Sequence, residues 1–425
     1  MAKKKKAEKP KREVTKRQLS RWQQQKRRQR IIFGSGILIV VAVLAVVGAG
    51  VYFGWYVPER QPLNETVIKV NDTEFDMGYY VKMLKYYGGG MGMQNMEFVA
   101  NWTVTNIQRN ELIRQEALKL GISVSDEEVD QELNSYDPPL SKDYRDVVRT
   151  GMLVERLLDE YFEQQVPQSA EQRHIWAMFL ESQSQANEIR ERLEGGELFS
   201  ELTAEFCLDS FCKEKEGDLG WQARGVLPLL MGSTVLDESA FNCEERVLSK
   251  PVYEETKFKM VGYWLIEVEF VDEEAEIVQV KTMLLSSEEE ANKVRNELEA
   301  GEDFATLAEE FSQHDESKEN GGELEVAKGD MSSAFDEFAF DPEVEMGSLS
   351  QPIRDDTFST QGGYWLIKVT EIAEDRQIEA GDRDLLKNEA LSKWIEALWD
   401  DPDNVVEDYL DDEKKEWAIM HALEV

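Results

Sequence analysis

The sequence predicts an α+β protein with an N-terminal transmembrane helix, a helical module, two copies of one small α+β unit and a C-terminal helix. Three observations support this prediction: a long apolar run near the N-terminus, helical periodicity after it, and an internal repeat in the second half. The chain has 425 residues, enough for roughly two to four domains. With 41% hydrophobic and 10% aromatic residues, it is too apolar to be mainly disordered.

The charge is divided unevenly along the chain. Residues 1–30 carry 14 lysines and arginines and only two glutamates, a net charge of +12. Because the whole chain has a formal net charge of −38, residues 31–425 carry −50. Nucleic-acid binding needs lysine and arginine clustered on the folded surface, so this acidic body argues against a nucleic-acid partner.

Between these two parts, residues 31–57 form a run of 27 residues without a charge. As a helix, this run is long enough to cross a hydrocarbon layer of ~30 Å with some tilt. A long basic leader and a run of this length favour an uncleaved anchor over a cleaved signal peptide. Since lysine and arginine beside such a run set its orientation, we expect residues 1–30 in the cytoplasm and residues 58–425 outside it. The predicted location is the cell membrane, with a single pass.

The three cysteines, Cys207, Cys212 and Cys243, all lie in the acidic part of the chain. A disulfide is permitted outside the cytoplasm, but three cysteines cannot all pair within one chain. Two alternatives remain open: one disulfide bridge with one remaining thiol, or three thiols. Because the spacing contains no CxxC or Cys/His zinc pattern, we expect neither a metal nor a cofactor.

The segment after the apolar run reads as a helical module. Residues 67–72 predict a short strand that ends in a turn, and helical patterns follow over 75–87 and 97–120, separated by a glycine- and methionine-rich break. Gly121 is suited to end the second helix, and Ser125 with the acids after it is typical of a helix start.

An internal repeat dominates the second half of the chain. Residues 186–219 and 291–324 match at 15 of 34 positions without a gap, at an offset of 105. Farther along, residues 262–268 match 363–369 at an offset of 101, so the first copy holds about four extra residues, placed most simply at 224–233. A unit of about 100 residues used twice indicates a domain duplication rather than a solenoid.

Each copy reads as strand, helix, loop, short helix and strand, the order of a small α+β domain. An apolar stripe over 385–399 is expected to pack back onto the N-terminal helices. The predicted parts are a basic tail 1–30, a transmembrane helix 31–57, a helical module 58–168, repeat domains 169–272 and 273–373, and an acidic C-terminal helical region 374–425.

The motifs of the repeat carry a resemblance to a known family. The second copy reads GEDF, LAEEFS, GGEL, GSLSQPI and GGYWLIKV in order, and the first copy has GDLGW and GYWLIEV. This set resembles the parvulin-type (PpiC-like) rotamase domain of peptidyl-prolyl isomerases. The segments VIKVNDTEF and LIRQEALKLGISVSDEEVDQEL resemble the helical chaperone module of SurA- and PrsA-type foldases. The resemblance implies a membrane-anchored extracytoplasmic foldase that binds unfolded or proline-containing exported polypeptides without a cofactor.

The resemblance also implies site residues in the second copy. Its apolar proline pocket would be Met331, Phe335 and Phe340, and its polar group Asp315. The two histidine positions of the family fall on Thr282 and, because the closing motif reads GYW, on Trp365.

In the first copy the matching surface would be formed by Leu236, Phe241 and Trp264. The chain has only three histidines, so neither copy can supply the histidine pair of the family. Of these, His314 is interpreted as an exposed loop residue. Two hypotheses follow: an isomerase that works through the second copy, or a non-catalytic holdase or scaffold with degenerate rotamase domains. The clients and the oligomeric state stay open.

Overall fold

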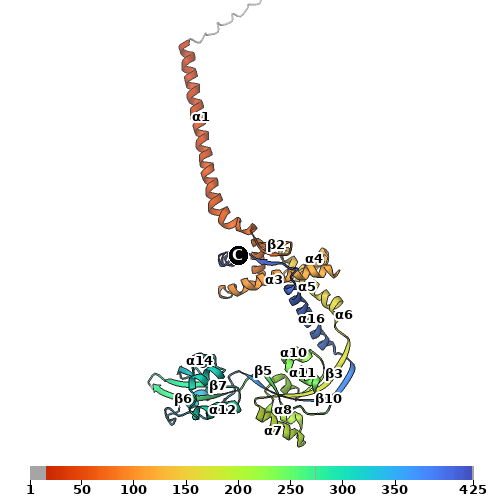
Figure 1. Cartoon of the computed structure of the whole chain (residues 1–425). Coiled ribbons are helices and arrows are strands. Elements are labelled where there is room, and N and C mark those ends of the chain that lie inside the picture. The colour runs from red at the N-terminus through yellow and green to blue at the C-terminus, as the bar shows by residue number, and fades with distance from the viewer. Residues whose placement is uncertain (1–15, 273, 424–425) are drawn as a thin grey trace, which may run out of the picture. The chain divides into compact units, whose positions relative to one another are not determined.

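The computed structural model describes residues 16–272 and 274–423 of the chain, which divides into two compact units (Figure 1). Unit 1 comprises Met1–Leu157 and Lys393–Val425, and unit 2 comprises Leu158–Ser392. The first half of the predicted basic tail, residues 1–15, lies outside the described residues.

The N-terminal helix α1 runs from Lys16 to Val51 and continues as a π-helical stretch, Tyr52–Arg60 (Figure 1). Among the residues that the structure describes, no helix combines the length and the apolar character needed to cross a membrane.

The remainder of unit 1 is a helical module around a small antiparallel sheet. The sheet has the order β11-β1-β2, and its edge strand β11 comes from the C-terminal region of the chain. The strands are β1 (Thr66–Val70), β2 (Thr73–Asp76) and β11 (Val406–Asp408). The helices are α2 (Met77–Gly88), α3 (Met93–Lys119), α4 (Asp126–Ser135), α5 (Arg145–Arg156), the C-terminal part of α16 (Ala380–Asp400) and α17 (Asp412–Leu423).

The helix boundaries of unit 1 follow the local signals in the sequence. Gly121, which follows α3, has a φ of 78°, a left-handed conformation that glycine adopts without a steric penalty. Ser125 and Glu128 form a capping box at the start of α4, in which each side chain accepts a hydrogen bond from the other residue's backbone N–H. The predicted break lies between Gly88 of α2 and Met93 of α3, and the predicted helix end at Gly121 and helix start at Ser125 are confirmed.

The core of unit 1 combines residues from the N-terminal and the C-terminal parts of the sequence. Buried residues of β1, α2 and α3 pack together with Leu398 of α16 and with Ala418 and Ala422 of α17. Trp394 and Trp417 pack against the same core. The predicted return of the C-terminal region onto the N-terminal helices is confirmed.

Unit 2 contains two four-stranded antiparallel sheets. The first sheet has the order β4-β3-β10-β5 and the second has the order β8-β7-β6-β9. The strands are β3 (Ser169–Leu180), β4 (Asp218–Ala223), β5 (Val252–Lys259), β6 (Gly262–Asp272), β7 (Ile277–Leu285), β8 (Glu323–Ala327), β9 (Ile353–Asp355) and β10 (Thr360–Gln377).

Each sheet takes its closing strand from the other sequence copy. Trp365 of β10 pairs with Phe179 of β3, and Trp264 of β6 pairs with Leu284 of β7. The repeat boundaries 169–272 and 273–373 therefore describe the sequence but not the sheets. The first sheet combines β3, β4 and β5 of the first copy with β10 of the second, and the second sheet combines β7, β8 and β9 of the second copy with β6 of the first. The exchange has a local cause, because only residues 273–276 separate β6 from β7, and so short a connection favours an antiparallel hairpin.

Helices cover the faces of both sheets. In the second sheet, one face packs against α12 and α13, and the other face packs against α15. The extra residues of the first copy form α10, which precedes α11. The helices of unit 2 are α6 (Glu163–Gln165), α7 (Gln183–Glu194), α8 (Phe199–Phe206), α9 (Ser210–Glu214), α10 (Val226–Met231), α11 (Thr234–Asn242), α12 (Glu288–Glu299), α13 (Phe304–Phe311), α14 (Asp315–Glu319), α15 (Ser333–Ala339) and the N-terminal part of α16, with a π-helical turn, Leu157–Phe162, before α6.

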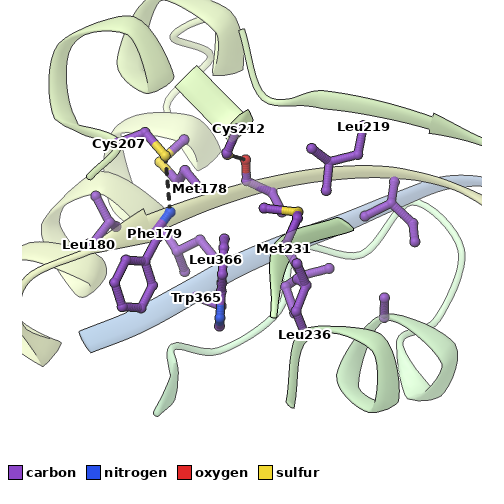
Figure 2. Close-up of a cluster of buried hydrophobic side chains, with 14 of the residues drawn as sticks. Met178, Phe179, Leu180, Cys207, Cys212, Leu219, Met231, Leu236, Trp365 and Leu366 are labelled. Carbon is purple, nitrogen blue, oxygen red and sulfur yellow. Dashed lines mark hydrogen bonds between the residues drawn. The ribbon is translucent and has the colours of Figure 1, made fainter. Parts of the chain in front are cut away.

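All three cysteines are free thiols in the described structure. Cys207 and Cys212 are buried close together at the first sheet (Figure 2), where the Cys207 sulfur accepts a hydrogen bond from the Phe179 N–H at 3.3 Å. Cys212 donates to the Ala177 carbonyl at 2.6 Å. Of the two alternatives left by the sequence, the structure has the three thiols.

Candidate functional site

A cluster of aromatic rings lies on the second sheet, on the face that packs against α15. The indole of Trp264 meets three rings edge-on: those of Phe335 at 5.3 Å, Phe358 at 5.1 Å and His314 at 5.3 Å between centroids. Trp264 and Phe335 are fully buried, whereas Phe358 and His314 are half-buried. Edge-to-face contacts fix ring orientation as well as burying apolar area. We call this cluster the second site.

Met331 and Phe340 pack against the same cluster and are partly exposed. The structure therefore brings together the three apolar residues that the resemblance implied, Met331, Phe335 and Phe340. Of the three, Phe335 is fully buried and lies in the core, whereas Met331 and Phe340 are partly exposed and are the two that can contact a proline ring.

The tryptophan of the second site comes from the other copy. Trp365, expected beside Met331, lies instead in the first sheet, and Trp264 of the first copy takes its place. The cause is the exchange of closing strands, which moves each GYW motif into the partner sheet. The Trp264 indole N–H donates to Asp355 at 3.0 Å, a residue that sequence reasoning missed.

The polar group of the second site is His314 rather than Asp315. Asp315 is exposed as the first residue of α14, whereas His314 caps that helix and its Nδ1 accepts from the Ser317 N–H at 3.3 Å. This bond places the proton of the neutral ring on Nε2. Burial lowers the pKa of His314, against the opposing influence of Glu316 and Asp315, so the ring is neutral at pH 7. His314 was expected to be an exposed loop residue; it does lie in the loop before α14, but its side chain is half-buried.

Thr282, the other position implied by the resemblance, is fully buried in β7. Its hydroxyl donates to the Leu265 carbonyl of the neighbouring strand at 3.0 Å. The hydroxyl therefore stabilises the sheet through this hydrogen bond and does not contribute to the exposed surface of the second site.

The equivalent place on the first sheet, which we call the first site, is filled differently (Figure 2). Trp365, on the blue strand β10, packs with Phe179, Met231 and Leu236, and its ring lies 4.9 Å from that of Phe179. All four side chains are buried. The first site thus resembles closed core more than an open pocket.

An ion pair occupies the first site where the second has a histidine and a phenylalanine. At the repeat offsets of 105 and 101, Asp209 corresponds to His314 and Lys257 to Phe358. Lys257 Nζ lies 2.7 Å from the Asp209 carboxylate and 2.8 Å from the Met231 carbonyl oxygen. A paired charge with these partners stabilises the local fold but gives a proline ring no apolar surface.

Both copies match the model of a known family. Residues 177–269 and 278–371 each match the PPIC-type PPIASE domain, a rotamase. Both copies are thus parvulin-like. We call the domain built on the first sheet, which carries the first site, the first rotamase domain, and the domain built on the second sheet, which carries the second site, the second rotamase domain.

Several curated proteins similar to this chain are foldases. The chain is 28% identical over 191 residues to the foldase protein PrsA of Caldanaerobacter subterraneus subsp. tengcongensis, covering 42% of this chain and 59% of that protein. It is 35% identical over 111 residues to foldase protein PrsA 4 of Bacillus cereus, covering 26% and 37%. The matched region thus spans less than two thirds of these relatives. The crystal structure of the peptidylprolyl isomerase PrsA from Bacillus anthracis matches 34% of this chain and 70% of that one, with 18% identity and a TM-score of 0.26.

Phe241, the remaining residue expected on the first rotamase domain, is covered by arginines. The guanidinium carbons of Arg173 and Arg224 lie 5.2 Å and 4.5 Å from the centre of its ring. These stacked cations bury Phe241 away from the Trp365 cluster. The structure does not bring Phe241 together with Leu236 and Trp365 into one binding surface.

Unit 1 offers a second kind of surface, a groove of about 490 Å³ between α3 and α17, which we call the α3–α17 groove. Its lining residues are Glu97, Ala100, Asn101, Asp412, Lys415, Glu416, Ile419 and Met420. Met420, which lines the groove, is 57% exposed, and Phe98 and Trp102, which lie on α3 outside the lining, are 74% and 45% exposed. Large apolar side chains gathered beside a groove are typical of a surface that binds another chain.

No group of histidine, cysteine and acidic side chains suited to hold a metal ion occurs in the described ranges 16–272 and 274–423.

Proposed function

We propose that the chain is a foldase for exported polypeptides that accelerates the cis/trans isomerisation of X-Pro bonds in its second rotamase domain. The observation that carries this proposal is the second site, where half-exposed Met331, Phe340 and Phe358 surround buried Trp264 and Phe335. The first rotamase domain, whose corresponding place holds an ion pair, contributes structure and binding surface rather than turnover.

Isomerisation of an X-Pro bond requires an apolar pocket of suitable shape and one polar group. Rotation about the peptide bond faces a barrier of about 20 kcal/mol, because amide resonance is lost in the transition state. An apolar pocket holds the proline ring while the preceding carbonyl turns, and only interactions that favour the twisted amide lower the barrier. The neutral His314 ring supplies a hydrogen-bonding group for the twisting amide without burying a charge.

Truncation of the open side of the pocket tests the activity. Met331→Ala in the full-length chain, purified in detergent, is expected to lower kcat/KM for a prolyl peptide by about tenfold, because the proline ring loses one wall of its pocket. A protease-coupled assay measures the rate. Met231→Ala is the matched control in the first rotamase domain, and equal losses in the two variants would contradict the assignment of turnover to the second domain.

Membrane attachment is a further part of the proposal. Residues 31–57 carry no charge and follow a strongly basic segment, which supports a single-pass anchor with residues 58–425 on the outer side. Release of the chain from membranes by alkaline carbonate would contradict an integral anchor.

A second candidate function, client holding without turnover, is favoured by the α3–α17 groove. The groove combines exposed apolar side chains with Glu97, Asp412 and Glu416, and its one lysine, Lys415, bonds to the Asn101 side chain at 2.9 Å. This pattern suits unfolded segments in which apolar residues alternate with lysine or arginine.

Loss of the exposed aromatic side chains tests this holding function. The double variant Phe98→Ser with Trp102→Ser is expected to lose most of the suppression of aggregation of a basic unfolded client, measured by light scattering. Phe98 is largely exposed, whereas Trp102 is 45% exposed and its ring meets that of Tyr87, so the double variant should lose about 1 to 2 kcal/mol of stability and remain folded. Prolyl peptide turnover should not change. Undiminished suppression would place client binding elsewhere.

A further inference from the structure

One buried carboxylate lies behind the second site. Asp355, the last residue of β9, is 2% exposed, and its two oxygens accept four hydrogen bonds. Oδ2 accepts from the indole N–H of Trp264 at 3.0 Å and from the hydroxyl of Ser332. Oδ1 accepts from the backbone N–H and the hydroxyl of Thr357 at 2.8 Å and 2.7 Å.

The donors belong to three separate segments, and each segment carries one aromatic wall of the site. Trp264 is itself a wall and lies on β6. Ser332 caps α15, where its oxygen also accepts from the Phe335 N–H at 3.2 Å. Thr357 directly precedes Phe358 in the chain. Asp355 therefore connects the supports of all three aromatic side chains.

The carboxylate of Asp355 is held in its ionised form. Burial acts to raise the pKa of Asp355, but the hydrogen bonds from Ser332, Thr357 and Trp264 outweigh it, and the pKa lies below its usual value. Hydrogen bonds to an ionised acceptor are shorter and stronger than those between neutral groups. Such bonds restrict the positions of the side chains that donate them.

The first rotamase domain lacks this connection. Glu254, which corresponds to Asp355 at the repeat offset of 101, accepts from the hydroxyls of Ser233 and Thr256. The buried indole nitrogen of Trp365 has no hydrogen-bond partner among the residues that the structure describes. Both copies have a carboxylate at this position, but only Asp355 of the second copy accepts a hydrogen bond from a tryptophan.

We propose that Asp355 is the positioning residue of the prolyl site: it sets Trp264, Phe335 and Phe358 relative to one another so that together they fit a turning proline ring. The proposal rests on the isomerase function proposed above. Asp355 itself does not touch the substrate, because it is buried and both of its oxygens accept hydrogen bonds from the protein. A pocket with loosened walls would bind the twisted amide less well than the native pocket does.

The test is Asp355→Asn in the full-length chain. Asparagine keeps the size of the side chain, but one of its two terminal atoms becomes a donor that faces donors. We expect kcat/KM to fall by more than tenfold at a temperature where the variant is fully folded, together with an altered near-ultraviolet circular dichroism spectrum of the tryptophans. Glu254→Gln is the matched control, with the same change of chemistry in the first rotamase domain, and should stay within twofold of wild type.

Two further measurements keep the outcome decisive. If Asp355→Asn does not fold, Thr357→Val, which removes one hydroxyl donor from an exposed residue, should lower kcat/KM by about threefold. Unchanged kcat/KM in folded Asp355→Asn, or in Thr357→Val, overturns the proposal. If the wild-type chain has no turnover, the proposed isomerase function fails. The positioning role then stands only if Asp355→Asn and Trp264→Phe are non-additive in thermal stability, and additive effects overturn it as well.

Discussion

Trp264→Leu is expected to lower prolyl isomerase activity by about a hundredfold, although Trp264 belongs to the sequence copy whose own site is closed. The indole is fully buried at the centre of the second site and contacts Phe335, Phe358 and His314. Leucine fills part of this volume but provides no edge-on ring contacts and no N–H for Asp355. The loss should appear in kcat/KM in the protease-coupled assay.

Trp365→Leu is the matched control for this prediction. Trp365 occupies the same place in the GYW motif, is equally buried, and lies in the first sheet. Both variants create a similar cavity and should lose similar stability, about 2 to 4 kcal/mol for a large buried side chain cut back to leucine. Only Trp264→Leu should lose turnover. The reverse result, with Trp365→Leu inactive and Trp264→Leu active, would show that each copy closes its own sheet in solution.

This contrast marks how far the sequence could predict the fold. Local signals placed the elements well: each copy was expected to open with a strand, as β3 and β7 do, the GYWLI motifs correspond to β6 and β10, and Ser125 begins α4. Strand partners are a different matter, because β6 and β10 carry nearly the same alternation of side chains. Either β6 or β10 could pair with either β3 or β7, so the pattern of side chains alone does not specify which strands pair.

The candidate site shows the same limit at the scale of single residues. Met331, Phe335 and Phe340 could be predicted, because the resemblance implied them from a motif that lies within one copy, and the structure packs them against one core cluster. Asp315 was the expected polar group, but it is exposed as the first residue of α14, and the polar side chain that contacts Trp264 is its neighbour His314, which caps that helix.

A signal for His314 was nevertheless present in the repeat. At the offset of 105, His314 matches Asp209, which is buried and caps α9 in the same way. Asp355 gave no such signal, because a buried carboxylate and an exposed one look alike in a sequence. Its role depends on three donors that are brought together only by the exchanged strand β6 and the cap of α15.

The ion pair of the first site should be required for the stability of its domain. Lys257→Met is expected to lower the free energy of unfolding of the first rotamase domain by about 3 to 5 kcal/mol, because it leaves the Asp209 carboxylate buried without its cation. For a domain of this size, the melting temperature should fall by more than about 10 °C. Calorimetry of the full-length chain measures the change.

A surface pair provides the control for this prediction. Lys281 and Glu269 also form an ion pair, but their side chains are 30% and 39% exposed. Lys281→Met should therefore cost less than about 1 kcal/mol. Adding Asp209→Asn to Lys257→Met removes the unpaired charge, so the double variant should recover part of the lost stability. A double variant no more stable than Lys257→Met would mean that packing by the lysine stem, rather than charge pairing, holds the first site together.

Because Phe358 takes the place of Lys257 in the second domain, the ion pair also accounts for the difference between the two sites: one copy keeps an aromatic wall where the other has a charge that must stay paired.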